Sequence, residues 1–92
     1  MKVKVRAFAS FREILGRERE MEMKEGSTVA DLLGDLALAS QRFREAAFDD
    51  SGQLKDYVLL MKNRKRIDSL QDLKSELCEG DEVAVFPPVA GG

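Results

Sequence analysis

Residues 28–36, Thr28-Val29-Ala30-Asp31-Leu32-Leu33-Gly34-Asp35-Leu36, predict the one substantial helix of this chain. Apolar side chains recur there at i, i+3, i+4 and i+7, the spacing of a helix with one buried face. Thr28 is a good N-cap, and Asp31, three residues later, completes a variant of the capping box. A helix with a single apolar face must pack against another layer, so the flanking segments decide the fold. The apolar face consists of Val29, Leu32, Leu33 and Leu36.

The segment before this helix predicts two strands. Residues 2–8 alternate strictly between polar and apolar side chains, which is typical of a strand with one buried face. Phe8 falls on the polar, outward phase of that strand. A short link with helical character follows over residues 10–15, and the alternation returns more weakly over residues 18–24. Because the link is short, we expect an antiparallel pair. The inward residues of the first strand are Val3, Val5 and Ala7.

The segment after the helix predicts further strands with short helical turns between them. Residues 41–48 predict a second helical turn or two. The apolar run Tyr57–Met61 predicts a strand in the middle of the sheet, and Ile67 the start of a short return strand. Residues 82–86 predict the last strand, which Pro87 ends because proline cannot donate to the ladder. The order β-β-α-β-(β)-β predicts an α+β domain, a mixed four- to five-stranded sheet packed on one main helix.

Length and composition indicate one small globular domain. The chain has 92 residues, of which 43% are hydrophobic and 35% charged. A formal net charge of −2 gives no general affinity for nucleic acid or an anionic membrane. No apolar run approaches the roughly 20 residues that span a bilayer, and the first residues lack a signal-peptide core. We therefore expect a cytoplasmic protein that binds neither nucleic acid nor membrane.

The inventory of reactive side chains argues against a self-sufficient enzyme. The sequence contains no histidine, the usual general base near neutral pH and the commonest metal ligand. Cys78 is the only cysteine, so an intramolecular disulfide and zinc-type cysteine pairs are excluded. We expect Cys78 to pack as a small hydrophobic side chain without a catalytic role. No metal site is predicted.

The last six residues predict an extended tail that enters the active site of another protein. Pro87 and Pro88 fix φ and favour an extended path, and side chains then shrink from Val89 and Ala90 to two glycines. We predict a folded domain over residues 1–86 and an extended, flexible tail over residues 87–92. The alternative, two glycines that simply end a frayed terminus, is weaker behind a strand and a stiff spacer.

The reacting group of this tail is predicted to be the carboxylate of Gly92, next to Gly91. A carboxylate is a poor electrophile until it gains a good leaving group, as in an acyl-adenylate. The sequence offers no glycine-rich loop that could cradle the phosphates of ATP. Activation must therefore come from a partner enzyme, and we expect no cofactor bound directly by this chain.

Two segments carry a resemblance to a known family. The run Asp81-Glu82-Val83-Ala84-Val85-Phe86-Pro87-Pro88-Val89-Ala90-Gly91-Gly92 resembles the C-terminus of the MoaD family, the small sulfur-carrier subunits of molybdopterin synthase. Residues 3–16 resemble that family's first strand and following turn. The family has a ubiquitin-like β-grasp fold, consistent with the predicted order of elements. Residues 48–62 look more like the archaeal ubiquitin-like small modifier proteins, which share the same ending.

The resemblance implies a sulfur carrier in molybdenum cofactor biosynthesis. An E1-like adenylating enzyme would use ATP and Mg²⁺ to adenylate Gly92, and a sulfur donor protein would convert the adenylate to a thiocarboxylate. The large subunit of molybdopterin synthase would receive the tail and supply the rest of the active site, so this chain would be a sulfur-donor subunit. The alternative is a ubiquitin-like modifier joined through Gly92 to lysines of target proteins. A third is a carrier for another product, such as a thiolated tRNA base or the thiazole of thiamine, and the Phe-Pro-Pro ending argues against thiamine.

Partner-binding residues are predicted around the end of the last strand. Phe8 and Phe86 both fall on the outward phase of their strands, and in a β-grasp fold the first and last strands are neighbours. The two rings would then form a docking surface with the tail residues Pro87, Pro88, Val89 and Ala90. The alternative places one or both rings under a loop at the edge of the sheet. The basic run over residues 62–66 is interpreted as a solvated hairpin turn, and the alternative is a site that steers an acidic partner surface.

Overall fold

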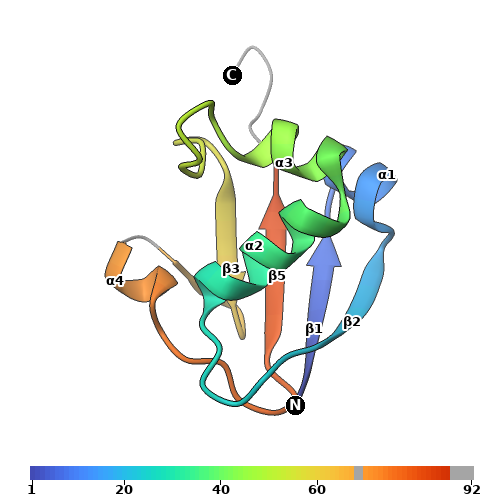
Figure 1. Cartoon of the computed structure of the whole chain (residues 1–92). Helices are drawn as coiled ribbons and strands as arrows, with labels where there is room; N and C mark the ends of the chain where they lie inside the picture. The colour runs from blue at the N-terminus through green and yellow to red at the C-terminus, as the bar shows by residue number, and fades with distance from the viewer. Residues whose placement is uncertain (68–69, 88–92) are drawn as a thin grey trace.

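A mixed sheet forms the centre of the molecule (Figure 1). The computed structural model describes residues 1–67 and 70–87. The strands in that part are β1 (Lys2–Ala7), β2 (Glu18–Glu22), β3 (Leu59–Lys62), β4 (Lys65–Arg66) and β5 (Glu82–Phe86). They lie in the order β2-β1-β5-β3-β4, with β1 and β5 parallel and the other neighbours antiparallel. The mixed five-stranded sheet and the adjacency of the first and last strands are confirmed.

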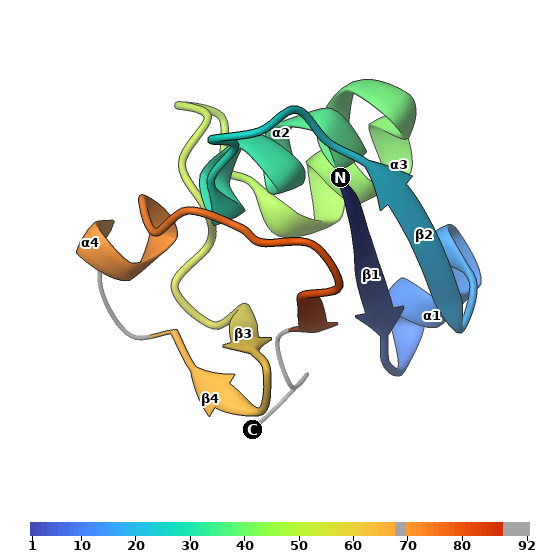
Figure 2. The same cartoon turned by 90° about the horizontal axis from the view of Figure 1, so that it is seen from below.

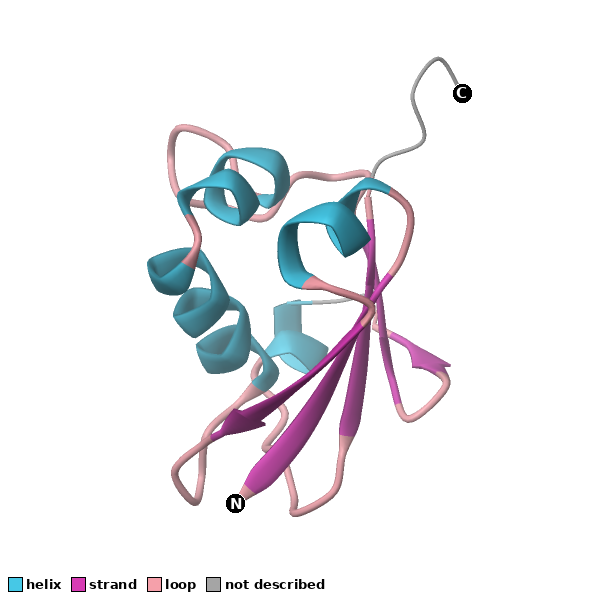
Figure 3. Ribbon diagram, turned by 90° about the vertical axis from the view of Figure 1, so that its right-hand side faces the viewer, coloured by secondary structure: helices cyan, strands magenta, loops and turns pink. Residues whose placement is uncertain are grey.

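The longer helices lie on one side of this sheet. The helices are α1 (Ser10–Leu15), α2 (Val29–Ala39), α3 (Gln41–Ala47) and α4 (Leu70–Leu73). Figure 3 shows α2 and α3 stacked along one face of the strands, and Figure 2 shows the same layers from below. The other face of β1, β5 and β3 is left open. The prediction of one main helix against one face of the sheet is confirmed.

The main helix begins where the sequence predicts it. The backbone N–H of Asp31 donates to Thr28 Oγ1 at 3.1 Å, and the N–H of Thr28 donates to Asp31 Oδ2 at 2.9 Å. This reciprocal capping box satisfies two donors that a helix start would otherwise leave without partners. All four residues of the predicted apolar face are buried.

The core lies between this helix and the inner face of the sheet. Strand β1 alternates between exposed and buried residues as predicted, and β5 alternates in step with it. Because β1 and β5 are parallel neighbours, their inward side chains form one apolar layer against the helices. The fully buried large side chains are Phe11, Phe43, Leu32, Leu36, Val3, Val5, Val29, Val83 and Val85.

The predicted strand Tyr57–Met61 is wrong at its start, but it lies inside the sheet as predicted, between β5 and the short β4. Tyr57 lies outside β3, and 79% of its surface is exposed. β5 occupies the middle of the sheet, while β3 pairs with β5 on one side and only with the two-residue β4 on the other. An apolar run suggests burial on both faces, but the helices cover one face only, so Leu60 alone is buried in β3. The return strand β4 ends at Arg66, one residue before the predicted Ile67.

The burial predicted for Cys78 is also wrong. The thiol is exposed, and the preceding Leu77 occupies the buried position with 4% of its surface accessible. The backbone N–H of Cys78 donates to Asp81 Oδ2 at 2.8 Å, so this residue begins a polar turn. Among residues 1–67 and 70–87, no helix is long and apolar enough to cross a membrane.

Candidate functional site

Two aromatic rings stack at the end of the parallel strand pair. Ala7 of β1 lies opposite Val85 of β5, and the backbone N–H of Phe8 donates to the carbonyl of Val85 at 3.2 Å. Phe8 and Phe86 follow this pair on the outward phase, so their side chains emerge together. The ring centroids are 4.3 Å apart and the planes differ by 9°. The predicted neighbourhood of Phe8 and Phe86 is confirmed.

The chain reverses sharply after the first ring. Ala9 has φ 51° and ψ −130°, a conformation that favours glycine, and it leads directly into α1. This turn brings Arg12 of α1 back over Phe8, with its guanidinium carbon 5.8 Å from the ring centroid. Arg12 Nε also donates to the carbonyl of Ala7 at 3.4 Å. The guanidinium carbon of Arg6 lies 5.5 Å from the same centroid, so Phe8 has two cationic neighbours.

A second turn brings another arginine to this surface. Asn63 and Arg64 have φ 50° and 70° and form the two-residue connection between β3 and β4. The side chain of Asn63 fixes the turn against β5, since Nδ2 donates to Asp81 Oδ1 at 3.0 Å and Oδ1 accepts from the N–H of Glu82 at 2.9 Å. The turn therefore holds Arg64 beside the open face of the sheet.

These side chains enclose a shallow hollow of about 120 Å³ on the open face of the sheet. Its floor is apolar and its rim is charged. Both rings are half-buried, which agrees with neither full exposure nor burial under a loop. We call Phe8, Phe86, Met61 and Ala84, together with Arg6, Arg12 and Arg64 at the rim, the aromatic patch. The hollow is lined by Arg6, Phe8, Met61, Arg64, Glu82, Ala84 and Phe86.

The rest of the open face is polar, and the cations of β1 there form ion pairs with carboxylates of the neighbouring strands. The outward residues of β1 are basic, and those of β2 are acidic. Exposed ion pairs of this kind contribute little to stability, but they leave no net charge on this part of the face. The apolar part of the open face is therefore confined to the end where Pro87 continues the chain. The ion pairs are Lys2–Glu20 (3.9 Å), Lys4–Glu18 (3.8 Å) and Arg6–Glu82 (3.4 Å).

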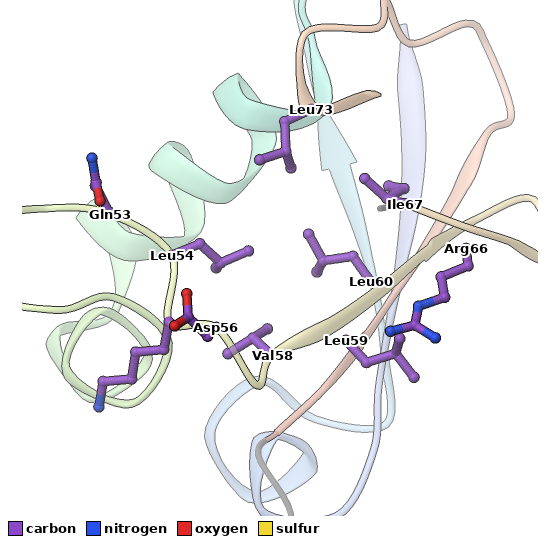
Figure 4. Close-up of a pocket in the computed structure, with 10 residues that line it drawn as sticks. Gln53, Leu54, Asp56, Val58, Leu59, Leu60, Arg66, Ile67 and Leu73 are labelled. Carbon is purple, nitrogen blue, oxygen red and sulfur yellow. The ribbon is translucent and has the colours of Figure 1, made fainter. Parts of the chain in front are cut away.

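A larger pocket of about 400 Å³ lies beside the start of β3 (Figure 4). Leu54, Val58 and Leu73 point toward its centre, and Asp56 and Arg66 lie at its rim. These polar groups do not form a recognisable catalytic arrangement. Asp49, in the preceding turn, has its pKa lowered by a hydrogen bond from the Ser51 hydroxyl at 2.6 Å. Within the described part of the chain, no three His, Cys, Asp or Glu side chains gather as metal ligands.

The remaining predicted site residues follow the patch along the chain. Pro87 comes directly after Phe86 and is half-buried. The predicted tail residues Pro88, Val89, Ala90, Gly91 and Gly92 lie outside the described residues, so their roles stay predictions. Sequence reasoning missed Arg12 and Arg64 as parts of the patch. Arg12 lies four residues after Phe8 in the sequence. The strained turn at Ala9 is what brings its guanidinium over the Phe8 ring, and the sequence does not indicate that turn.

The strand order, with β1 and β5 parallel at its centre, defines a ubiquitin-like β-grasp protein, and the aromatic patch lies beside its C-terminal strand. The sequence profile of the ThiS family matches residues 5–92, and the chain belongs to this family. Across their full lengths, the chain is 34% identical to small archaeal modifier protein 3 of Haloferax volcanii. It is also 34% identical to the molybdopterin synthase sulfur carrier subunit of Escherichia coli, over 98% of this chain and 99% of that one. The structure is also similar to the crystal structure of SAMP1 from Haloferax volcanii. The match covers 100% of each chain, with a TM-score of 0.87 and 30% sequence identity.

Proposed function

We propose that this protein is a sulfur carrier that delivers sulfur from Gly92 as the small subunit of molybdopterin synthase. The similarity to the Escherichia coli sulfur carrier subunit over nearly the full length supports this role. The observation that carries the proposal is the stacked pair of Phe8 and Phe86, one residue before the tail begins. A paired aromatic surface at that position suits a partner that must hold the domain while it works on the tail.

The chemistry divides between this chain and its partners. An E1-like adenylating enzyme binds ATP and Mg²⁺, and the carboxylate of Gly92 attacks the α-phosphate and releases pyrophosphate. A sulfur donor protein then supplies sulfide, which attacks the acyl carbon and displaces AMP; the oxygen that joined the acyl group to the phosphate leaves with AMP, and sulfur takes its place. The six residues after Phe86 span up to roughly 20 Å when extended, enough to reach into a partner's active site. The large subunit of molybdopterin synthase receives the loaded tail, in the cytoplasm.

A second candidate is a ubiquitin-like modifier. Its support is the 34% identity to small archaeal modifier protein 3 over the whole of both chains. The activation step is the same in both roles, because each needs an adenylated Gly92. The roles diverge in the nucleophile: a sulfur donor gives the thiocarboxylate, whereas the ε-amine of a lysine gives an isopeptide bond to a target protein.

Mass spectrometry of protein from its own cells distinguishes the two roles. A sulfur carrier shows an intact mass in which one terminal oxygen is replaced by sulfur. A modifier leaves Gly-Gly remnants on lysines of other proteins after digestion. Deletion of Gly92 should abolish both signals and leave the fold intact, with Gly34→Ala, at a helical glycine with room for a Cβ, as a control outside the tail that should retain the signal. Retention of either signal without Gly92 would contradict both roles.

A further inference from the structure

The cations of β1 and of the aromatic patch fall into two groups. Lys2, Lys4 and Arg6 of β1 each have a carboxylate partner 3.4 to 3.9 Å away. Arg12 and Arg64, which border the aromatic patch, form no ion pair within the part of the chain that the structure describes. The outward cations of β1 are therefore neutralised, whereas Arg12 and Arg64 at the patch have no carboxylate partner among residues 1–67 and 70–87.

The guanidinium of Arg12 and the turn that presents Arg64 are held in place before any partner binds. The carbonyl of Ala7 and the ring of Phe8 fix Arg12. The side chain of Asn63 fixes the turn that presents Arg64. A planar guanidinium binds a carboxylate through two parallel hydrogen bonds, and it loses less entropy when it is already oriented. A fixed guanidinium and a second one on a fixed turn, both beside an apolar floor, suit a partner whose carboxylates flank an apolar depression.

We propose that the adenylating enzyme presents carboxylates to Arg12 and Arg64 around an apolar depression that receives the Phe8–Phe86 pair. This inference rests on the proposed function and adds the chemistry by which the partner recognises this chain. The protein has a net charge of −2, and its helical face carries Asp31 and Asp35 on α2. An acidic partner surface is therefore repelled beside α2 and attracted by the patch. Charge selects the orientation in which the tail points into the enzyme.

The test is charge reversal at the patch with a matched control. The double variant Arg12→Glu/Arg64→Glu is compared with Lys24→Glu/Arg42→Glu, which changes the net charge equally at exposed residues beside α2 and in α3. ATP–pyrophosphate exchange with the adenylating enzyme of the same organism gives kcat and KM for each chain. We expect the patch variant to lose about tenfold or more in kcat/KM at low salt through KM, with kcat retained. The control should stay within about twofold of the unaltered chain.

The salt dependence provides an independent readout. For the unaltered chain and the control, kcat/KM should fall as ionic strength rises, because exposed charges are screened. The patch variant should lack this dependence. Thermal unfolding verifies that each variant is folded, and Arg12→Gln/Arg64→Gln replaces the reversal if it is not. Equal kcat/KM for the patch and control variants, or an unchanged salt slope, would overturn this inference while adenylation itself persists. Absence of adenylation of the unaltered chain would instead overturn the proposed function.

Discussion

The rings of Phe8 and Phe86 lie 4.3 Å apart and nearly parallel, although they come from the first and last strands of the fold. This contact exists only because β1 and β5 pair in parallel with Ala7 opposite Val85. The stack therefore forms only when β1 and β5 are paired, and it lies directly before Pro87, where the predicted tail begins. A partner that binds the two rings therefore contacts the domain directly beside Pro87.

Removing either ring should impair docking more than folding. We expect Phe8→Ala and Phe86→Ala each to raise KM for adenylation, since truncation of a central aromatic anchor costs about 2 kcal/mol or more. The rings also stabilise each other, so a double-mutant cycle on the free energy of unfolding should give a coupling of about 1 kcal/mol. Chemical denaturation measures the coupling and pyrophosphate exchange measures KM.

Tyr57→Ala is the matched control for the ring substitutions. Tyr57 is 79% exposed and lies outside the aromatic patch. Its truncation should change neither KM nor stability by more than about 0.5 kcal/mol. A KM for Tyr57→Ala as high as that for Phe86→Ala would show that loss of any exposed ring disturbs the assay. The patch would then have no special part in docking.

Replacing Ala9 by glycine should stabilise the protein. Ala9 has φ 51° and ψ −130°, which costs a non-glycine residue about 1–3 kcal/mol. Glycine relieves this strain but adds conformational freedom to the unfolded chain, worth about 0.5–1 kcal/mol. We expect a net gain of about 1 kcal/mol, which corresponds to a rise of about 4–8 °C in Tm for a domain of this size.

Ala30→Gly is the control for Ala9→Gly: the chemical change is the same, but we expect Tm to fall rather than rise. Ala30 is exposed within α2, where glycine costs about 1 kcal/mol relative to alanine. Differential scanning calorimetry of both variants separates backbone strain from the general effect of glycine. A lower Tm for Ala9→Gly would mean that the turn before α1 is not strained.

The sequence predicted correctly those helices and strands whose bounds and buried side are set by their own and adjacent residues. The helix over residues 28–36 carries both its cap and its apolar face, so its start and buried side are correct. Residues 82–86 carry alternation and a following proline, so the bounds of β5 are correct. Phe8 and Phe86 were predicted as neighbours from their outward phase and the family's strand order.

Features that depend on distant parts of the chain were not predictable in this way. The start of β3 depends on which face the helices cover, and an apolar run does not contain that information. The exposed Cys78 depends on Leu77 taking the inward position beside it. Arg12 and Arg64 reach the patch through turns with positive φ at non-glycine residues, for which the sequence has no glycine signal.

The capping box at the start of α2 should contribute measurably to stability. Thr28→Ala removes the acceptor for the N–H of Asp31, and we expect a loss of about 1 kcal/mol in the free energy of unfolding. Thr28→Ser keeps a hydroxyl in the same place and should retain most of that stability. Urea denaturation compares the three chains. Equal losses for serine and alanine would show that packing of the Thr28 methyl group, not capping, is responsible.

Asn63 combines two contributions that substitution can separate. Its side chain donates to Asp81 at 3.0 Å and accepts from Glu82 at 2.9 Å, and its backbone has φ 50°. Asn63→Gly loses the side-chain hydrogen bonds but fits the backbone, whereas Asn63→Ala loses the bonds and keeps a Cβ at positive φ. We expect alanine to be about 1 kcal/mol less stable than glycine, because asparagine and glycine tolerate this region better. Urea denaturation measures the difference.

Both substitutions should also weaken docking, because the turn that presents Arg64 is then no longer tied to β5. We expect KM for adenylation to rise to a similar extent in Asn63→Gly and Asn63→Ala despite their different stabilities. Gly26→Ala, at another turn with φ 85°, is the control: it should lower stability through backbone strain and leave KM unchanged. If KM instead follows stability across all three variants, the effect on docking comes from general loosening of the fold. If KM rises only in the Asn63 variants, the side chain of Asn63 is a positioning residue for Arg64.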